Sequence, residues 1–174
     1  SIRVRSLPMI HRVPCSGFLF EEKAGMRHLL GDMMNFYNVP VYRRAAIKEG
    51  EDFVTSDGRI IPNSYLTTPA DPPLRYAYCS DTAYNEALLP IIEGVDVLYH
   101  EATFGDDAEA LAKETCHSTA RQAAIIARKA GVKQLLLGHF SARYENERQL
   151  LEQACEEFAP SFLAREELKI ILGR

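Results

Sequence analysis

Three short apolar runs in the chain each end in residues that can bind a metal ion or transfer a proton. The runs and their following residues are Tyr76-Ala77-Tyr78-Cys79 before Ser80-Asp81-Thr82, Val95-Asp96-Val97-Leu98-Tyr99 before His100-Glu101-Ala102-Thr103, and Gln134-Leu135-Leu136-Leu137-Gly138 before His139-Phe140-Ser141. Short apolar runs that alternate with helical segments predict a largely parallel sheet of the α/β class. Because such sheets carry functional residues at the carboxyl ends of strands, we expect Asp81, Glu101 and His139 at one edge.

A fourth candidate, His117, directly precedes a strongly helical segment. The helix is expected at 120–130, with Ser118 or Thr119 as its N-cap and Gly131 after its end. Helices of a parallel α/β sheet begin at the edge where the strands end. His117 is therefore expected beside the other three side chains.

The rest of the chain predicts further elements and one irregular segment. Strands are expected at 2–7, 18–20, 133–137 and 168–172, and helices at 26–37, 84–93, 106–113 and 145–158. The segment 21–73 contains little periodicity beyond one helix and many turn residues, and loops of such length are usually functional or mobile. We expect a protruding arm there, within a single domain that spans 1–174.

Composition excludes several classes of protein. The 174 residues are 47% hydrophobic and 25% charged, which is typical of one globular domain or a large part of one. The net charge of -4 argues against indiscriminate coating of nucleic acid. The four cysteines form no Cys-x-x-Cys pair, so reduced thiols in the cytoplasm are expected, and no apolar run reaches the length of a membrane span. Because the chain begins inside a strand pattern without Met, we expect it to be a fragment.

The candidate residues suit metal-assisted hydrolysis of a phosphodiester. Zinc held by His and Asp activates water and stabilises negative charge, and Asp81 and His139 are suitable ligands. His117 can bind a phosphate oxygen at a helix start, and Glu101 can hold its imidazole in one tautomer or keep it protonated as an acid. Each residue also has an ordinary interpretation, since Asp81 can form an Asx turn and Glu101 can cap a helix.

Basic residues outside this edge are fewer. Tyr42-Arg43-Arg44 and Lys48 form the densest basic patch, which either binds phosphates or is simply a solvated surface. His11 follows the first predicted strand, and taken alone it is an ordinary loop histidine.

Four motifs together resemble the C-terminal half of ribonuclease Z, the tRNA 3′-processing endonuclease branch of the metallo-β-lactamase fold. They are Ser80-Asp81-Thr82, His100-Glu101-Ala102-Thr103-Phe104, His117-Ser118-Thr119 and Leu137-Gly138-His139-Phe140-Ser141-Ala142-Arg143-Tyr144. The upstream segments 10–18, 50–53 and 57–61 are similar to the same family. The resemblance implies an αββα four-layer sandwich, of which this chain is roughly the C-terminal half plus the arm.

The resemblance also implies a role for each matching residue. It makes His11, Asp81 and His139 zinc ligands, with Asp81 as the bridge between two metals. It makes Glu101 and His117 the catalytic pair that transfers a proton to the leaving group. Arg143 is expected near a tRNA phosphate, and the basic patch Arg43, Arg44 and Lys48 is a second expected contact.

Two features depart from the family pattern. The His-x-His-x-Asp-His motif that supplies most metal ligands is absent, because no two histidines here are separated by one residue. The arm carries Asn38-Val39-Pro40-Val41-Tyr42 where the family usually has Gly-Pro before Val-Tyr. The fragment alone is therefore expected to be inactive.

The function implied for the intact protein is zinc-dependent removal of the 3′ trailer from precursor tRNA, which leaves a 3′-hydroxyl. A cytoplasmic homodimer with precursor tRNA as partner and no membrane association is expected. One alternative is another phosphodiesterase of the metallo-β-lactamase type that acts on small substrates. A second is a short, non-catalytic form that binds tRNA or a protein partner.

Overall fold

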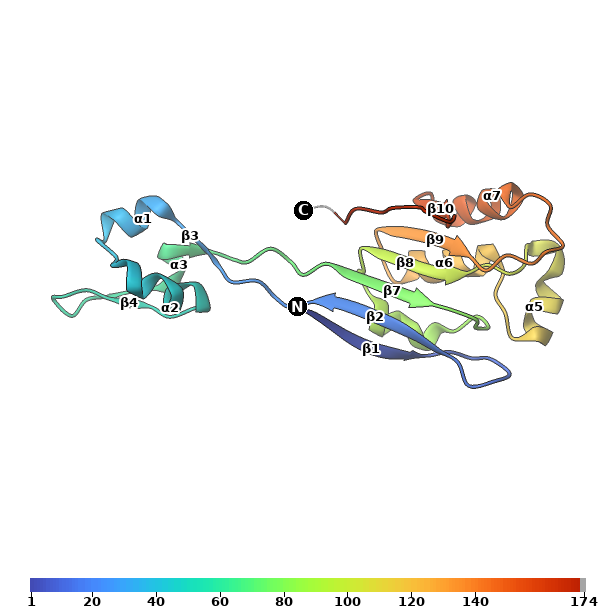
Figure 1. The fold of residues 1–174 in the computed structure, drawn as a ribbon, viewed down its shortest axis with the longest axis horizontal. Coiled ribbons are helices and arrows are strands. Elements are labelled where there is room, and N and C mark those ends of the chain that lie inside the picture. Colours follow the sequence, from blue (N-terminus) through green and yellow to red (C-terminus); the bar gives the residue numbers. More distant parts are fainter. Residues whose placement is uncertain (173–174) are drawn as a thin grey trace. The chain divides into compact units, whose positions relative to one another are not determined.

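The computed structural model describes residues 1–172, which fall into two compact units. One unit consists of residues 1–22 and 74–172, and the other consists of Lys23–Pro73. The first unit is built on one large sheet, whereas the second contains short helices and two-stranded ribbons (Figure 1).

The large sheet has six strands in the order β1-β2-β7-β8-β9-β10. They are β1 (Ile2–Pro8), β2 (Ser16–Glu22), β7 (Arg75–Cys79), β8 (Val97–Glu101), β9 (Gln134–Gly138) and β10 (Ser161–Leu163). β1 and β2 are antiparallel to their neighbours, and β7 through β10 run parallel. The prediction of a mixed α/β fold with a largely parallel sheet is confirmed.

Four helices accompany this sheet, namely α4 (Leu89–Ile92), α5 (Glu109–Thr115), α6 (Ala120–Lys129) and α7 (Arg148–Glu157). α6 begins as the sequence predicts, with a capping box at its N-terminus. The Thr119 side chain accepts a hydrogen bond from the backbone N–H of Gln122, and the Gln122 side chain accepts one from the backbone N–H of Thr119. Gly131 follows its end with a φ of 61°, a left-handed conformation that favours glycine. The predicted helix at 84–93 is split into a 3₁₀ turn, Glu86–Leu88, and α4.

The final strand differs from the predicted one. The sequence predicts a strand at 168–172, but the last strand is β10, whose residues pair with 135–137 of β9. The backbone N–H of Ala164 also bonds to the carbonyl of Leu137 at 2.7 Å. Because these bonds occupy the free edge of β9, the later apolar run cannot pair with that strand. The prediction at 168–172 is wrong for this reason.

One face of the sheet packs against the helices to form the main core. Leu98, Leu135 and Leu137 are fully buried in it together with Ala123 and Ile126 of α6. The side chains of α6 that enter this core are mostly alanines, so its backbone can approach the strands closely. This packing holds the carboxyl ends of β7, β8 and β9 in register.

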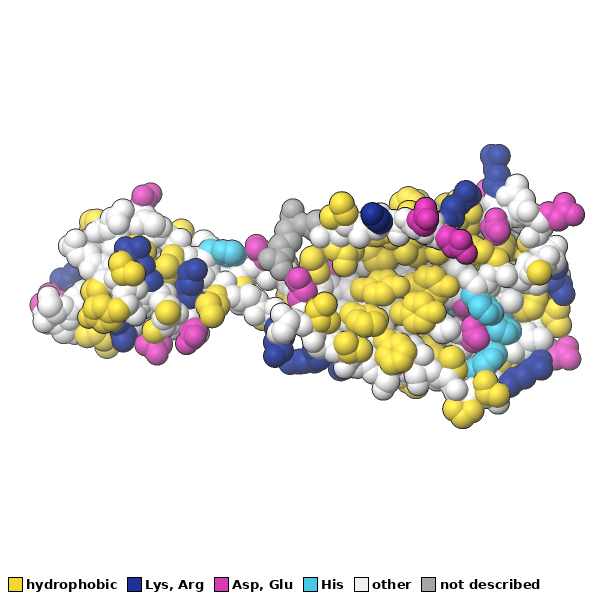
Figure 2. All heavy atoms as spheres, in the orientation of Figure 1, with side chains coloured by type: hydrophobic (Ala, Val, Ile, Leu, Met, Phe, Trp, Pro, Cys, Tyr) yellow, Lys and Arg dark blue, Asp and Glu magenta, His cyan; other side chains and the backbone are white. Residues whose placement is uncertain are grey.

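The opposite face carries aromatic side chains that alternate with the core residues along β2, β7 and β8. Phe20 stacks on Tyr76 with ring centroids 5.8 Å apart, and Tyr78 stacks on Tyr99 at 4.7 Å. Figure 2 shows hydrophobic side chains gathered over this face of the first unit, with histidines at one end. Since every second strand residue points to this side, the sheet has two apolar faces.

The second unit has an apolar core of its own. Its elements are β3 (His28–Leu29), α1 (Gly31–Phe36), a 3₁₀ turn (Val41–Arg43), α2 (Arg44–Glu49), β4 (Phe53–Val54), β5 (Ile60–Ile61), α3 (Asn63–Leu66) and β6 (Thr67–Thr68). The buried hydrophobic residues of this core are Met34, Val39, Ile47, Phe53, Ile61 and Leu66. The predicted helix at 26–37 is shorter than expected, because His28 and Leu29 pair with β6 instead.

None of the helices in residues 1–172 combines the length and apolar character that a bilayer crossing requires.

Candidate active site

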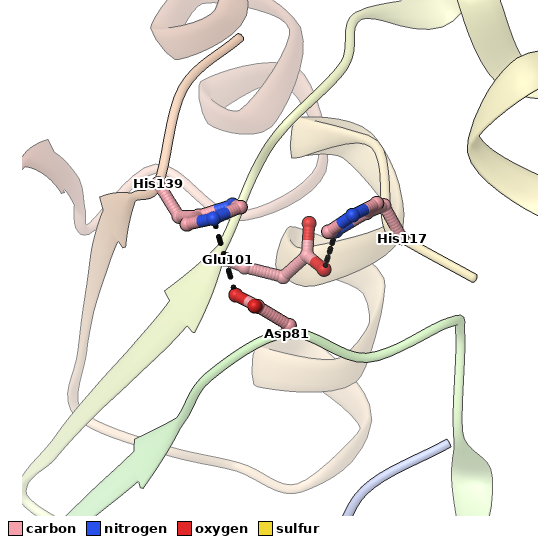
Figure 3. Close-up of side chains that lie close together, drawn as sticks. All are labelled: Asp81, Glu101, His117 and His139. Carbon is pink, nitrogen blue, oxygen red and sulfur yellow. Dashed lines mark hydrogen bonds and ion pairs between the residues drawn. The ribbon is translucent and has the colours of Figure 1, made fainter. Parts of the chain in front are cut away.

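Four side chains meet where the parallel strands of the large sheet end. Asp81, Glu101, His117 and His139 each contribute one potential metal-binding atom, and these atoms all lie within 4.8 Å of one another (Figure 3). Asp81 follows β7, Glu101 ends β8, His139 follows β9, and His117 lies between α5 and α6. The structure therefore brings together four of the five residues that the sequence assigns to metal binding or catalysis.

Glu101 is the most completely hydrogen-bonded member of this cluster. Its Oε1 accepts from the Thr82 backbone N–H at 2.8 Å and lies 2.7 Å from Nδ1 of His117. Its Oε2 accepts from the Thr103 and Ser118 backbone N–H groups at 3.2 and 3.1 Å and from the Thr103 hydroxyl at 2.6 Å. Because three backbone N–H groups donate to its two oxygens, the buried carboxyl group acts as a hydrogen-bond acceptor.

His117 is oriented by this carboxylate. Because Glu101 accepts hydrogen bonds, Nδ1 of His117 carries the proton and Nε2 is the free nitrogen of the ring. The backbone N–H of His117 bonds to the carbonyl of Ala112 at 2.8 Å, and Cys116 turns the chain with a φ of 59°. A turn between two helices thus presents the imidazole to the strand ends.

Asp81 and His139 form a second pair beside the first. Oδ1 of Asp81 lies 3.2 Å from Nε2 of His139, and Nδ1 of His139 lies 2.8 Å from the Thr103 hydroxyl. A lone pair on Nε2 facing a carboxylate needs a proton or a metal ion between them. An imidazole nitrogen and a carboxylate oxygen are both common zinc ligands, so this pair fits a divalent metal ion.

The backbone at His139 has an uncommon conformation. Its φ is 57°, in the left-handed region, and the preceding Gly138 lies under the ring of Tyr99. A Cβ built on Gly138 would lie 2.2 Å from the Tyr99 hydroxyl oxygen, so only glycine fits this position. Burial and the neighbouring Tyr78 raise the pKa of Tyr99 to about 12, so its hydroxyl remains protonated at neutral pH.

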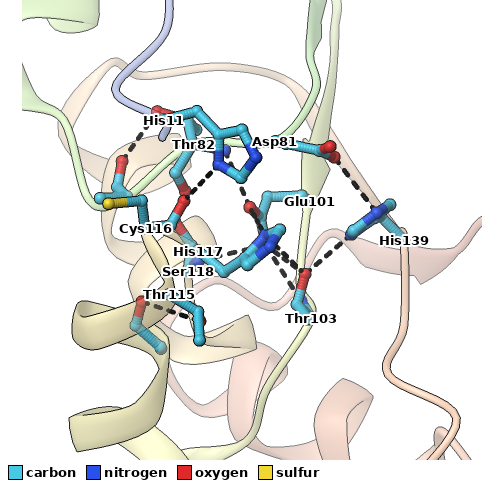
Figure 4. A network of polar contacts seen from close by, with 12 residues as sticks. His11, Asp81, Thr82, Glu101, Thr103, Thr115, Cys116, His117, Ser118 and His139 are labelled. Atoms are coloured by element: carbon cyan, nitrogen blue, oxygen red, sulfur yellow. Dashed lines mark hydrogen bonds and ion pairs between the residues drawn. The ribbon is translucent and has the colours of Figure 1, made fainter. Parts of the chain in front are cut away.

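His11 lies next to the cluster but outside the group of four. Its ring centroid is 5.0 Å from that of His117 in an edge-on arrangement, and its Nδ1 lies 3.1 Å from the carbonyl oxygen of Cys116 (Figure 4). Since a carbonyl only accepts, Nδ1 donates and Nε2 is the free nitrogen. In His11, His117 and His139 alike, Nδ1 is therefore the hydrogen-bonded ring nitrogen.

The basic residues singled out in the sequence lie in different places. Arg143 stacks over the ring of Phe104 at 5.1 Å, and that ring meets His117 edge-on at 6.1 Å. Arg43 pairs with Glu51 at 3.2 Å. Arg44 and Lys48 belong to α2 in the unit 23–73, and the buried Nε of Arg44 has no hydrogen-bond partner among the described residues.

Thr103 is the site residue that sequence reasoning missed. Its hydroxyl oxygen contacts Glu101, His139 and, at 3.3 Å, Nδ1 of His117. The sequence places it in the quoted run His100-Glu101-Ala102-Thr103, but a threonine two residues after a glutamate carries no signal of contact with two histidines. Only the meeting of three chain segments reveals it.

Comparison with known proteins gives one consistent result. No family model matches the chain. It is 54% identical to ribonuclease Z of Porphyromonas gingivalis over 99% of its own length and 57% of that protein, and 53% identical to ribonuclease Z of Bacteroides fragilis over the same shares. The chain thus spans somewhat more than half the length of these curated relatives.

Solved structures share the fold. The metallo-β-lactamase fold protein YhfI from Bacillus subtilis superposes with a TM-score of 0.59 at 18% identity, covering 93% of this chain and 46% of that one. The short form of human tRNase Z superposes with a TM-score of 0.57 at 22% identity, covering 98% and 43%. The chain therefore has the metallo-β-lactamase fold and is, over nearly its whole length, a homologue of proteins named ribonuclease Z.

Proposed function

We propose that the protein to which this chain belongs is a zinc-dependent endoribonuclease that removes the 3′ trailer from precursor tRNA and leaves a 3′-hydroxyl. The observation that carries the proposal is the Glu101–His117 pair, set beside the Asp81–His139 pair in a chain 54% identical to a ribonuclease Z. The two pairs divide the chemistry between proton transfer and metal binding.

Asp81, His139 and His11 are the proposed metal ligands. Nδ1 of each histidine is already hydrogen-bonded, to Thr103 in His139 and to the Cys116 carbonyl in His11, so Nε2 is the proposed coordinating nitrogen. In His139 that atom lies 3.2 Å from its fellow ligand Asp81. Zinc, when bound, supplies an activated water and stabilises negative charge on the phosphate. Glu101 is not proposed as a ligand, because both of its oxygens are saturated by donors.

His117 is the proposed general acid. As an imidazolium it keeps Nδ1–H on Glu101 and presents Nε2–H to the departing ribose oxygen. The buried carboxylate stabilises the positive charge before transfer and holds the ring in place afterwards. The proton thus passes from Nε2 to the leaving oxygen while the Nδ1 hydrogen bond persists.

Arg143 and the patch Arg43, Arg44 and Lys48 are proposed contacts for tRNA phosphates. The Arg143 guanidinium is held on the Phe104 ring close to His117, where it suits a phosphate beside the cleaved bond. A cytoplasmic homodimer with precursor tRNA as its substrate completes the proposal.

The test is cleavage of a precursor tRNA by the full-length protein. We expect one cut that leaves a 3′-hydroxyl on the tRNA, loss of cleavage with a chelator and recovery with zinc. The same RNA without its trailer is the control substrate and should remain intact. If the protein fails to cut the precursor but hydrolyses small phosphodiesters, the proposal is wrong.

A further inference from the structure

The Thr103 hydroxyl lies between the two functional pairs. Its oxygen is 2.6 Å from Oε2 of Glu101 and 2.8 Å from Nδ1 of His139. Figure 4 shows Thr103 reaching both Glu101 and His139. Thr103 is only 6% exposed, so solvent does not compete for these bonds.

Hydrogen-bond chemistry assigns a direction to each contact. A hydroxyl has one proton, and Glu101 accepts hydrogen bonds on both oxygens, so the Thr103 proton points to Glu101. Toward His139 the same oxygen can then only accept. Nδ1 of His139 must therefore carry a hydrogen.

This direction determines the tautomer of His139. With Nδ1 bound to hydrogen, the metal-binding lone pair of the neutral ring lies on Nε2, the atom 3.2 Å from Asp81. The imidazoles of His139 and His117 are nearly parallel, with an interplanar angle of 18°, and both have Nδ1 within 3.3 Å of the Thr103 oxygen. The Thr103 hydroxyl thus orients the ring of His139, whereas Glu101 orients that of His117.

The backbone of Thr103 supports the same loop independently. Its carbonyl accepts from the Ser141 N–H at 3.1 Å, so the turn that carries His139 remains attached when the hydroxyl is removed. A substitution at this side chain can therefore affect the ring of His139 while its backbone stays in position.

We propose that Thr103 is a positioning residue that, by donating to Glu101 and accepting from Nδ1 of His139, determines which nitrogen of His139 binds the metal. The inference rests on the proposed metal-dependent function, but it concerns metal binding and not RNA cleavage. Groups that hold the second nitrogen of a metal-binding histidine typically contribute 10-fold to 100-fold to metal affinity.

The test compares Thr103→Val, Thr103→Ser and Thr115→Val in the full-length protein. Thr103→Val keeps the shape and removes the hydroxyl, whereas Thr103→Ser keeps the hydroxyl. Thr115→Val is the matched control, because the Thr115 hydroxyl bonds only to the helix carbonyls of Leu111 and Ala112, at 2.7 and 3.4 Å. Zinc affinity is measured by competition with a chromophoric chelator, and nitrogen-15 spectra of the zinc-loaded protein identify the coordinating atom.

We expect Nε2 coordination by His139 in the unaltered protein, a loss of about 10-fold to 100-fold in zinc affinity in Thr103→Val, and near-normal affinity in Thr103→Ser and Thr115→Val. Amide spectra that show a folded Thr103→Val protein separate this loss from unfolding. If Thr103→Val does not fold, the nitrogen-15 spectra of the unaltered and Thr103→Ser proteins provide the test. Coordination of zinc by Nδ1 of His139 in either protein overturns the proposal. Unchanged affinity in a folded Thr103→Val, or an equal loss in Thr103→Ser, also overturns it.

These readouts separate this inference from the function of the site. A protein that binds zinc as described but fails to cut precursor tRNA upholds the role of Thr103 and refutes the proposed reaction. If the protein cuts precursor tRNA but its Thr103→Val variant binds zinc normally, the proposed reaction is upheld and the role of Thr103 is refuted.

Discussion

Nδ1 of His117 lies 2.7 Å from Oε1 of Glu101, and the Glu101 side chain is completely buried whereas that of His117 is 16% exposed. The carboxylate thus lies behind the ring, where water cannot reach it, and the free Nε2 is available to a substrate. Because Glu101 is saturated by other donors, it holds the imidazole without competing for metal. This arrangement separates the proposed acid from the proposed metal ligands and makes their roles testable.

His117→Ala in the full-length protein should lower turnover by roughly a hundredfold or more while metal content remains unchanged, since general-acid losses usually have this size. Asp81→Ala should instead lose metal and activity together. Single-turnover cleavage and elemental analysis of the same preparations provide the comparison. Loss of zinc in His117→Ala would place His117 among the metal ligands.

Glu101→Gln should resemble His117→Ala, because an amide in place of the carboxylate no longer stabilises the protonated ring. The double variant Glu101→Gln with His117→Ala should be little slower than either single variant, since residues that act as a unit are not additive. The measurement is a double-mutant cycle on the cleavage rate. Losses that simply multiply would show that the two residues act independently.

The 174-residue chain by itself should bind zinc weakly. His11, Asp81 and His139 would be divided between two metal positions, which leaves each position with too few protein groups for a closed coordination shell. Elemental analysis after dialysis should find much less than one zinc per chain. Two firmly held zinc ions per chain would contradict this expectation.

The aromatic face of the large sheet should make the isolated chain prone to association. Phe18 is exposed on this face, Phe20 and Tyr76 beside it are partly exposed, and an extended exposed apolar surface favours self-association. The double variant Phe18→Ser with Phe20→Ser should bind less of an apolar dye and sediment more slowly. Phe36→Ser, which removes an exposed ring in the other unit, is the control and should change little.

A monomeric chain that binds no dye and unfolds sharply at high temperature would show that the face is not accessible.

His100 should make the folded protein sensitive to mild acid. Burial lowers the pKa of His100 below its ordinary value of 6.5, and its Nε2 has no hydrogen-bond partner among the described residues. The folded state therefore keeps the ring neutral, while the unfolded chain takes up a proton as the pH falls through 6.5. The free energy of unfolding should then decrease below this pH by up to about 1.4 kcal/mol per pH unit.

The variant His100→Asn isolates this effect, since its amide N–H can replace the Nδ1 donor that lies 2.8 Å from the Glu101 carbonyl. Urea unfolding between about pH 7.5 and 5.5 should show a shallower loss of stability in this variant. His28→Asn removes an exposed histidine and serves as the control. Equal pH dependence in His100→Asn and the unaltered chain would refute the prediction.

Cys79 should be the slowest thiol to react with a disulfide reagent. Burial raises the pKa of Cys79 to about 12, whereas Cys15, Cys116 and Cys155 are partly exposed. Timed modification followed by mass spectrometry should show Cys79 reacting only after denaturation. A Cys79→Ala variant should keep the same number of fast thiols, and rapid labelling of Cys79 in the folded chain would contradict its burial.

Local sequence alone placed the candidate residues at the ends of their elements. The short apolar runs predicted β7, β8 and β9, and the capping residue Thr119 predicted the start of α6, because strand pattern and helix capping depend on neighbours only a few residues away. The rule that parallel strands end at one edge then brought Asp81, Glu101 and His139 together.

Tertiary structure decided what the same residues do with their hydrogen bonds. The contact between Thr103 and His139 joins residues 36 apart in the sequence, and that between His11 and Cys116 joins residues 105 apart. A local sequence pattern does not specify which ring nitrogen of a histidine is hydrogen-bonded, since both nitrogens belong to the same side chain. The final strand was also misplaced for lack of tertiary information. Any later apolar segment could pair with the edge of β9, and packing selects Ser161–Leu163.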